Sequence, residues 1–174
     1  PMAEHMIPIL DELGFTYQFD EAHNNFNGDC GNLIAWWEGT DPEVEPFFLS
    51  AHLDTVLPTK GLTTVIKDKT IYTDGTTILG ADDREAIAIY IEAIRVIQEN
   101  NIPCGPLELI LTVNEQKGLI GSKYMDYSLI KSKSGMIFDS DGDVGQIILQ
   151  GGYSSRIHVD IKSKSSHIGL DPEV

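Results

Sequence analysis

Four short hydrophobic runs recur along the chain and predict the buried strands of a sheet. They cover residues 33–37, 47–51, 107–113 and 136–138. The runs are rich in β-branched and aromatic residues, and turn-forming residues flank them. This pattern is typical of short strands that are covered on both faces.

Two segments have the spacing of amphipathic helices. Residues 82–100 place apolar side chains on one stripe and charged side chains on the opposite one, and Asn101 and Pro103 then end the helix. The apolar stripe holds Ile87, Tyr90, Ile91, Ile94 and Ile97, and the charged stripe holds Arg84, Glu92, Arg95 and Glu99. A second helix opens the chain and ends before Gly14. Strands that alternate with helices predict an α/β fold, with a mostly parallel sheet sandwiched by helices.

Two further elements complete the predicted organisation. Residues 65–76 predict a hairpin with Asp74 and Gly75 in its turn. After Gly151 and Gly152, residues 153–162 alternate between apolar and polar positions, which predicts a new, half-buried strand. We therefore expect one domain over residues 1–151 and the start of a second over residues 152–174.

Composition and charge narrow the classes of function. The 174 residues are 41% hydrophobic, which is ordinary for a globular domain. The net charge of −15 argues against nucleic acid and anionic membranes as partners. Cys30 and Cys104 lack metal-type spacing and are predicted to be reduced thiols. With no apolar run long enough to cross a bilayer and no signal-like start, we expect a cytoplasmic protein.

Polar residues follow the predicted strands at the points where ligands bind in α/β sheets. They are His52 and Asp54 after the second run, Glu115 and Gln116 after the third, Asp139 after the fourth, and Asp82 and Asp83 at the entrance to the main helix. Each of these residues alone is more often structural. Together, one imidazole and several carboxylates at one rim of the sheet predict a site for zinc or a related divalent ion.

These residues lie in motifs that resemble the peptidase T-like aminopeptidases, within the wider group of zinc-dependent aminoacylases, carboxypeptidases and dipeptidases. The matching segments are residues 52–56, 74–83, 118–122 and 139–145. The resemblance implies a zinc exopeptidase-like catalytic domain over residues 1–151. It also implies that residues 152–174 begin a truncated α+β lid domain, through which a full-length protein could form a homodimer.

The resemblance further implies a site for two zinc ions. His52 would bind one ion, and Asp54 would hold and polarise its imidazole. Asp82 would bridge both ions, with a cis peptide bond to the next residue. Gln116 would occupy a ligand position, and Asp139 would bind the metal opposite.

The same resemblance implies a hydrolytic mechanism on short peptides. Glu115 would be the general base that deprotonates the water bridging the two ions, and His167 of the lid would contact the substrate. The expected activity is release of the N-terminal residue from peptides such as tripeptides. The residues leave open a related amidohydrolase that acts on N-acyl amino acids or dipeptides, because most substrate contacts come from the lid.

The sequence departs from the family pattern at the metal site. Gln116 stands where the family has glutamate, so the metal on that side is expected to bind weakly or not at all, and Lys117 adds a positive charge beside it. The family also takes a late histidine ligand from beyond the length of this chain. A degenerate or partial, catalytically weak domain is therefore a second hypothesis, and we expect little or no aminopeptidase activity from these 174 residues alone.

Overall fold

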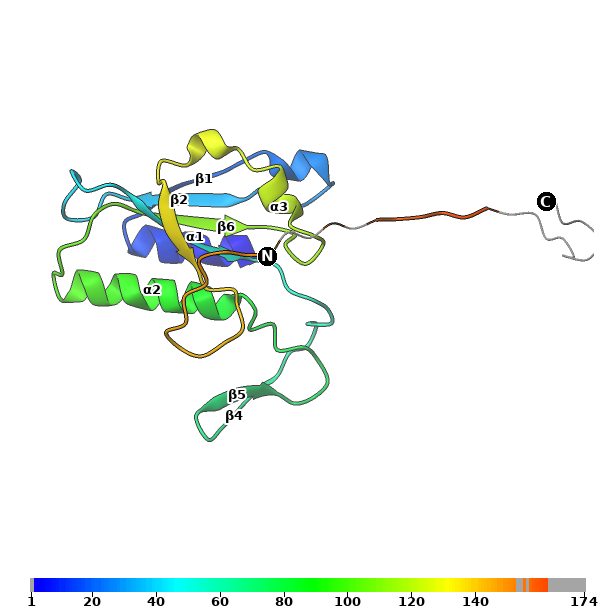
Figure 1. The fold of residues 1–174 in the computed structure, drawn as a ribbon. Coiled ribbons are helices and arrows are strands. Elements are labelled where there is room, and N and C mark those ends of the chain that lie inside the picture. Colours follow the sequence, from blue (N-terminus) through cyan, green and yellow to red (C-terminus); the bar gives the residue numbers. More distant parts are fainter. Residues whose placement is uncertain (1, 153–154, 156, 163–174) are drawn as a thin grey trace, which may run out of the picture. The chain divides into compact units, whose positions relative to one another are not determined.

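A mixed sheet of five strands organises the first 141 residues (Figure 1). The computed structural model describes residues 2–152, 155 and 157–162 of the chain. The strand order is β1-β2-β6-β3-β7. The strands are β1 (Thr16–Phe19), β2 (Leu33–Trp37), β3 (Phe47–His52), β6 (Leu107–Thr112) and β7 (Ser134–Ile137). The four hydrophobic runs of the sequence thus correspond to β2, β3, β6 and β7.

The sheet is mixed, so the prediction of a mostly parallel sheet is wrong. β3 is parallel to both β6 and β7, whereas β2 is antiparallel to both β1 and β6. β1 has a polar, partly exposed edge pattern that gives no hydrophobic run, and it was therefore not predicted. β1 and β2 follow one another in the chain and pair as antiparallel neighbours, an arrangement that needs no crossover connection.

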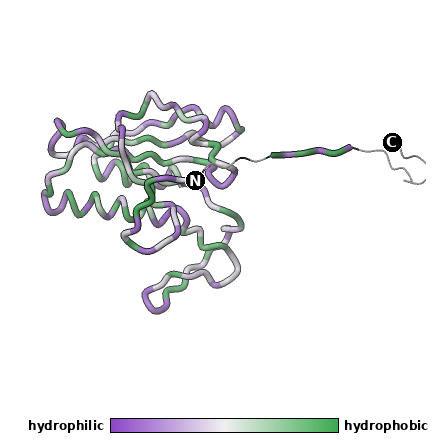
Figure 2. The backbone as a smooth tube through the Cα atoms, viewed as in Figure 1, coloured by the Kyte–Doolittle hydropathy of each residue, from purple (hydrophilic) through white to green (hydrophobic). Residues whose placement is uncertain are grey.

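Both long helices cover the same face of the sheet (Figure 1). They are α1 (Met2–Glu12) and α2 (Arg84–Glu99), and the predicted helical stripe of α2 is buried in the core. Figure 2 shows the alternation of hydrophobic and hydrophilic residues along α2. The core is formed by Met6 and Leu10 of α1, by Ile87, Tyr90, Ile91 and Ile94 of α2, and by Leu33, Ala35, Ala51, Leu109 and Leu111 of the sheet.

The opposite face meets the segment between β6 and β7 instead of a long helix. This segment contains the short helices α3 (Ile120–Lys123) and η2 (Tyr127–Leu129). Nζ of Lys131 lies 5.5 Å from the ring centroid of Trp36. The buried carboxylate of Glu108 accepts the backbone N–H groups of Lys131 and Ser132 at 2.8 and 2.7 Å. These contacts bring the chain across β2 and β6 into β7.

The predicted hairpin is present, but its turn lies elsewhere. β4 (Thr64–Lys67) and β5 (Thr70–Thr73) form a separate two-stranded sheet. Asp68 and Lys69 join them with φ angles of 50° and 64°, as a two-residue turn between twisted strands requires. Asp74 instead follows β5, where its carboxylate accepts the N–H of Thr76 at 2.9 Å.

Residues 142–174 form a second unit. Its described residues, 142–152, 155 and 157–162, contain neither helix nor strand. The strand predicted for residues 153–162 is therefore not found at those of its positions that the structure describes, and Ile157 and Val159 are 84% and 68% exposed. The predicted substrate residue His167 lies outside the described residues.

Two smaller observations bear on the composition. Cys30 and Cys104 are free thiols, as predicted. Among the described residues, no helix combines the length and the apolar character needed to cross a bilayer.

A buried polar cluster ties β2 to the segment that follows β6. Asn32 is fully buried, and its Nδ2 donates to the carboxylate of Asp20 at 2.8 Å and to the carbonyl of Gly121 at 3.0 Å. Its Oδ1 accepts the N–H of Val113 at 3.1 Å. A Cβ at Gly121 would lie 2.0 Å from the carbonyl oxygen of Val113, so only glycine permits this approach. The cluster thereby fixes both ends of the loop that contains Glu115.

Replacing Asn32 with alanine is expected to lower the free energy of unfolding by about 3 kcal/mol, because buried donors and acceptors would lose their partners. Urea unfolding followed by tryptophan fluorescence measures this change. Asn24→Ala is the matched control, because the Asn24 amide is exposed and bonds the exposed Glu21. A loss below about 1 kcal/mol for Asn32→Ala would contradict the structural role given to the cluster.

Candidate metal centre

The predicted site residues meet at one rim of the sheet because three parallel strands end there. His52 is the last residue of β3, and Glu115 and Asp139 follow β6 and β7. Asp82 and Asp83 immediately precede α2, which packs on the same sheet. The carboxyl ends of parallel strands lie at a common edge. Four segments that are distant in sequence therefore supply one imidazole and several carboxylates to one place.

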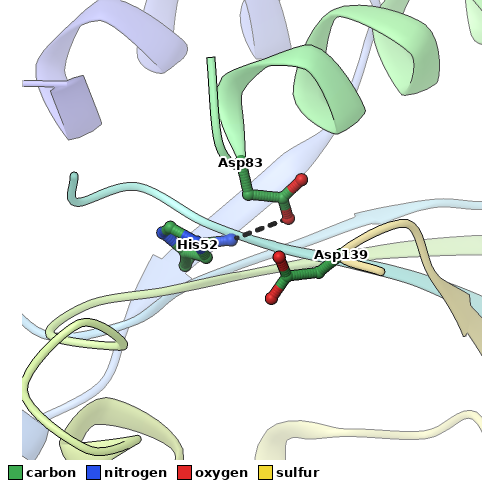
Figure 3. A group of neighbouring side chains, drawn as sticks. All are labelled: His52, Asp83 and Asp139. Carbon is green, nitrogen blue, oxygen red and sulfur yellow. Dashed lines mark hydrogen bonds between the residues drawn. The ribbon is translucent and has the colours of Figure 1, made fainter. Parts of the chain in front are cut away.

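The group with metal-ligand spacing consists of His52, Asp83 and Asp139 (Figure 3). One ligand atom from each lies within 4.8 Å of the other two. His52 and Asp83 are buried, whereas Asp139 is exposed. Figure 3 shows the Asp83 carboxylate, from the start of α2, and the Asp139 carboxylate, from beyond β7, on adjoining sides of His52. The Asp83 carboxylate also accepts the backbone N–H of His52 at 3.4 Å.

The imidazole of His52 is oriented by both of its nitrogens. Nδ1 lies 2.8 Å from the backbone carbonyl of Asp54, which can only accept, so Nδ1 carries the hydrogen. Nε2 faces the carboxylates of Asp82 and Glu115, at 2.8 and 3.8 Å. Loss of the proton that Nε2 shares with Asp82 would leave a neutral imidazole, oriented through Nδ1, whose Nε2 lone pair can bind a cation.

Asp54 organises two parts of the site. Its carboxylate accepts the backbone N–H groups of Glu115 and Gln116 at 3.0 and 3.2 Å, which holds the start of the loop after β6. Its contact with the imidazole of His52 is made by the backbone carbonyl, while the carboxylate oxygen is 3.7 Å from Nδ1. Asp54 thus links the predicted ligand His52 to the predicted base Glu115.

Gln116 and Asp82 are in contact at the exposed side of the site. Nε2 of Gln116 donates to Asp82 at 3.3 Å, and the other oxygen of the same carboxylate faces His52. The amide of Gln116 is therefore close enough to Asp82 for both side chains to contact the same ion. Unlike a glutamate, it brings no negative charge to that position.

Burial, and to a smaller extent mutual repulsion, shifts the pKa values of the carboxylates at the site. Burial, followed by repulsion from Asp139, raises the pKa of Asp83 to about 7. Burial also raises the pKa of Glu115 and that of Asp139, and neighbouring carboxylates add to both shifts. Burial alone would lower the pKa of His52, but its hydrogen bonds to Asp82 and to the Asp54 backbone raise it overall.

These residues fit a divalent cation. The carboxylates crowd around one imidazole, and burial, with repulsion between the carboxylates added to it, raises the pKa values of Asp83, Glu115 and Asp139. Imidazole nitrogen and carboxylate oxygen are ligands that zinc and related ions accept. A bound cation would offset the repulsion that the protein alone leaves uncompensated.

The structure brings the predicted residues His52, Asp82, Glu115, Gln116 and Asp139 to one rim, but the metal-spaced group found among the described residues contains Asp83 and not Asp82 or Gln116. The cis peptide bond between Asp82 and Asp83 is present, as the resemblance implied. Asp83 was expected only as the residue after a bridging ligand, whereas its buried carboxylate belongs to the metal-spaced group. Two adjacent aspartates before a helix give no signal in the sequence as to which one is buried.

Comparison with known proteins assigns the family. The model of peptidase family M28 matches residues 32–167, so the chain belongs to this family. It is 40% identical over 164 residues to the uncharacterized protein YqjE of Bacillus subtilis (strain 168), covering 94% of this chain and 44% of that protein. It is 32% identical over 99 residues to Peptidase T of Escherichia coli O9:H4 (strain HS), covering 57% of this chain and 24% of that protein.

Solved structures agree with this assignment. The crystal structure of aminopeptidase PepT from Bacillus cereus ATCC 10987 matches with a TM-score of 0.79 and 41% identity, covering 82% of this chain and 38% of that chain. A tripeptidase from Staphylococcus aureus matches with a TM-score of 0.77 and 36% identity, with the same coverage. The chain spans less than half the length of these relatives. The predicted resemblance to the peptidase T-like group is confirmed, and the fold is that of the zinc exopeptidases.

Without metal, stability is expected to fall as the pH rises toward neutrality. The pKa of Asp83 in the folded protein is about 7, above its ordinary value of 3.8, so the folded state holds this proton more tightly than the unfolded chain. The stabilisation is complete at low pH and is lost as the pH rises from about 4 through about 7. Thermal unfolding in the presence of a chelator, measured across this range, tests the expectation.

Asp83→Asn should flatten this pH dependence, because asparagine stays neutral at every pH in the range. The matched control is Asp68→Asn in the exposed hairpin turn, which should leave the slope as in the unmodified protein. An equal slope in the Asp83→Asn variant would show that another group controls the pH dependence.

Proposed function

We propose that this chain carries the metal-binding and general-base residues of a metallopeptidase that releases the N-terminal residue from short peptides. The observation behind the proposal is the convergence of His52, Asp82, Asp83 and Asp139 at one rim, with Glu115 3.8 Å from Nε2 of His52. The family and the fold are those of metallopeptidases. The names of the similar solved structures, an aminopeptidase and a tripeptidase, support the choice of substrate.

In this proposal His52, Asp82 and Asp139 would hold a divalent metal, with zinc as the expected ion, and the buried carboxylate of Asp83 lies close enough to His52 and Asp139 to contact the same ion. The amide oxygen of Gln116 would be available to a second ion beside Asp82. A bound metal of this kind supplies polarisation of the scissile carbonyl and lowers the pKa of water. The remaining steps are carried out by side chains of the protein.

Glu115 is positioned to move the proton. Asp54 fixes its backbone N–H at 3.0 Å, and its carboxylate is 26% exposed, so it can meet both solvent and substrate. Burial raises the pKa of Glu115, which brings the carboxylate closer to the range in which it exchanges protons near neutral pH. Glu115 would take a proton from the attacking water and deliver it to the leaving amine.

A second candidate function is a domain that binds metal but catalyses weakly. The specific observation in its favour is the hydrogen bond from Gln116 to Asp82 at 3.3 Å. This bond engages the Asp82 carboxylate, and the amide adds no negative charge that would attract a cation. Lys117, the next residue in the chain, is exposed and carries a positive charge.

A hydrolysis assay separates these possibilities. The zinc-loaded chain is incubated with a tripeptide, with the same tripeptide N-acetylated, and with buffer alone, and released amino acids are measured by mass spectrometry. We expect slow release of the N-terminal residue from the free tripeptide only, far below the roughly 10 per second of an ordinary enzyme. The same zinc-loaded chain with Glu115→Gln should release none.

Each other outcome has a defined meaning. Zinc binding without any hydrolysis would favour the catalytically weak domain, and preference for the acetylated peptide would favour an amidohydrolase for N-acyl substrates. Equal release by the Glu115→Gln variant would contradict the role of Glu115 as base. Failure to bind zinc would overturn the proposed metal centre.

Gln116→Glu is expected to raise zinc binding from about one ion toward two ions per chain, because the new carboxylate supplies the charge that the amide lacks. Zinc content after gel filtration, measured by mass spectrometry, gives the stoichiometry. Gln18→Glu makes the same charge change on the exposed edge strand β1 and should leave the zinc content unchanged. Two ions per chain already bound by the unmodified protein would disprove the expectation.

A further inference from the structure

The hydroxyl group of Tyr90 joins the segments that carry the candidate metal ligands. Tyr90 lies in α2 and is 2% exposed. Its O–H donates to the backbone carbonyl of Ser50 at 2.9 Å, and its oxygen accepts the backbone N–H of Phe138 at 3.0 Å. One buried oxygen atom therefore connects α2 to β3 and to the residue that follows β7.

Each of these contacts lies within two residues of a candidate metal ligand along the chain. Ser50 precedes His52 in β3, and Phe138 directly precedes Asp139. The helix that contains Tyr90 begins immediately after Asp83. We propose that Tyr90 is a positioning residue that sets the separation of His52, Asp83 and Asp139, and through it the affinity and geometry of metal binding. This inference rests on the metal centre of the proposed function.

The sheet alone does not place Asp139. The pairing of β3 with β7 ends at Ser50 and Ile137, so the backbone beyond Ile137 is no longer aligned by strand pairing. The next N–H, that of Phe138, is bonded to the Tyr90 hydroxyl. Tyr90 thus continues the alignment of β3 and β7 past the end of their ladder, at the point where His52 and Asp139 leave the sheet.

The ring of Tyr90 has a separate role that a phenylalanine would keep. It is part of the hydrophobic core and lies 5.1 Å, centroid to centroid, from the ring of Phe138. Tyr90→Phe therefore removes the two hydrogen bonds and retains the packing. It leaves the Ser50 carbonyl and the Phe138 N–H without this partner at a partly buried position.

The test is a metal titration of the whole chain after removal of bound metal. Zinc affinity is measured by competition with a chromophoric chelator, and the geometry of the site by the visible absorption of bound cobalt(II). We expect Tyr90→Phe to weaken zinc binding by about 10- to 100-fold, the usual effect of removing groups that orient metal ligands, and to shift the cobalt bands.

Ile94→Val is the matched control, because Ile94 is fully buried in the same helix and belongs to the hydrophobic core. It lowers stability without touching the ligand segments, and its zinc affinity should stay within about twofold of the unmodified protein. If Tyr90→Phe loses stability to the same degree as Ile94→Val while zinc affinity and the cobalt spectrum are unchanged, Tyr90 is only a core residue and the inference is overturned.

A second variant covers the case in which Tyr90→Phe does not fold. Tyr90→4-aminophenylalanine restores a donor to Ser50 but accepts poorly from Phe138, so its zinc affinity should lie below that of the unmodified protein. Affinity equal to that of the unmodified protein would count against the inference. If the unmodified protein itself binds no zinc, the proposed metal centre is wrong and the inference fails with it. If the unmodified protein and the Tyr90 variant bind zinc equally well, only the role of Tyr90 is rejected.

Discussion

The parallel alignment of β3 with β6 and β7 is the constraint from which the site follows. Because the three strands run in the same direction, the residues that leave them share one rim of the sheet. α2 packs on the same sheet and begins at that rim, so Asp82 and Asp83 arrive beside His52. Changing the direction of one strand would move its ligand to the far edge. The antiparallel pair β1 and β2 extends the sheet on the other side of β6, away from this rim's ligands.

Carboxylates gathered at one rim repel one another, and hydrogen bonds from the surrounding structure hold them together despite this repulsion. Burial, with repulsion from neighbouring carboxylates added to it, raises the pKa values of Asp83 and Asp139. Hydrogen bonds between side chains and the backbone hold the loop after β6 in place. The Asp54 carboxylate accepts the N–H of Glu115, and the Asn32 amide bonds the backbone of Val113 and Gly121 at the two ends of the loop. The hydroxyl of Tyr90 does the same for the segment after β7. The protein thus uses hydrogen bonds to preserve an arrangement that its own charges oppose, which is what a pre-formed cation site requires.

Sequence predicted those parts of the fold in which one physical signal dominates. The buried strands β2, β3 and β6 appear as apolar runs, and α2 appears through its apolar stripe. β1 was missed because an edge strand needs only half of its residues to be apolar, and the hairpin turn was misplaced because Asp68 and Lys69 adopt positive φ without glycine. The role of Tyr90 could not be predicted, since its partners are backbone atoms and its position on the helix fits an ordinary core residue.

Gln116 lowers the negative charge that the site offers to a cation, because it is an amide. In the protein without metal, its amide donates to Asp82 and relieves part of the crowding. For its oxygen to face a proposed second ion beside Asp82, the amide would have to give up this hydrogen bond. A glutamate in this position would oppose Asp82 in the absence of metal and attract a cation instead. Under the proposed function, the amide would stabilise the metal-free arrangement and weaken binding of a second ion, whereas the carboxylates of Asp83 and Asp139 beside His52 would still attract the first. The two sides of the centre should consequently differ in affinity, with the buried side filled first.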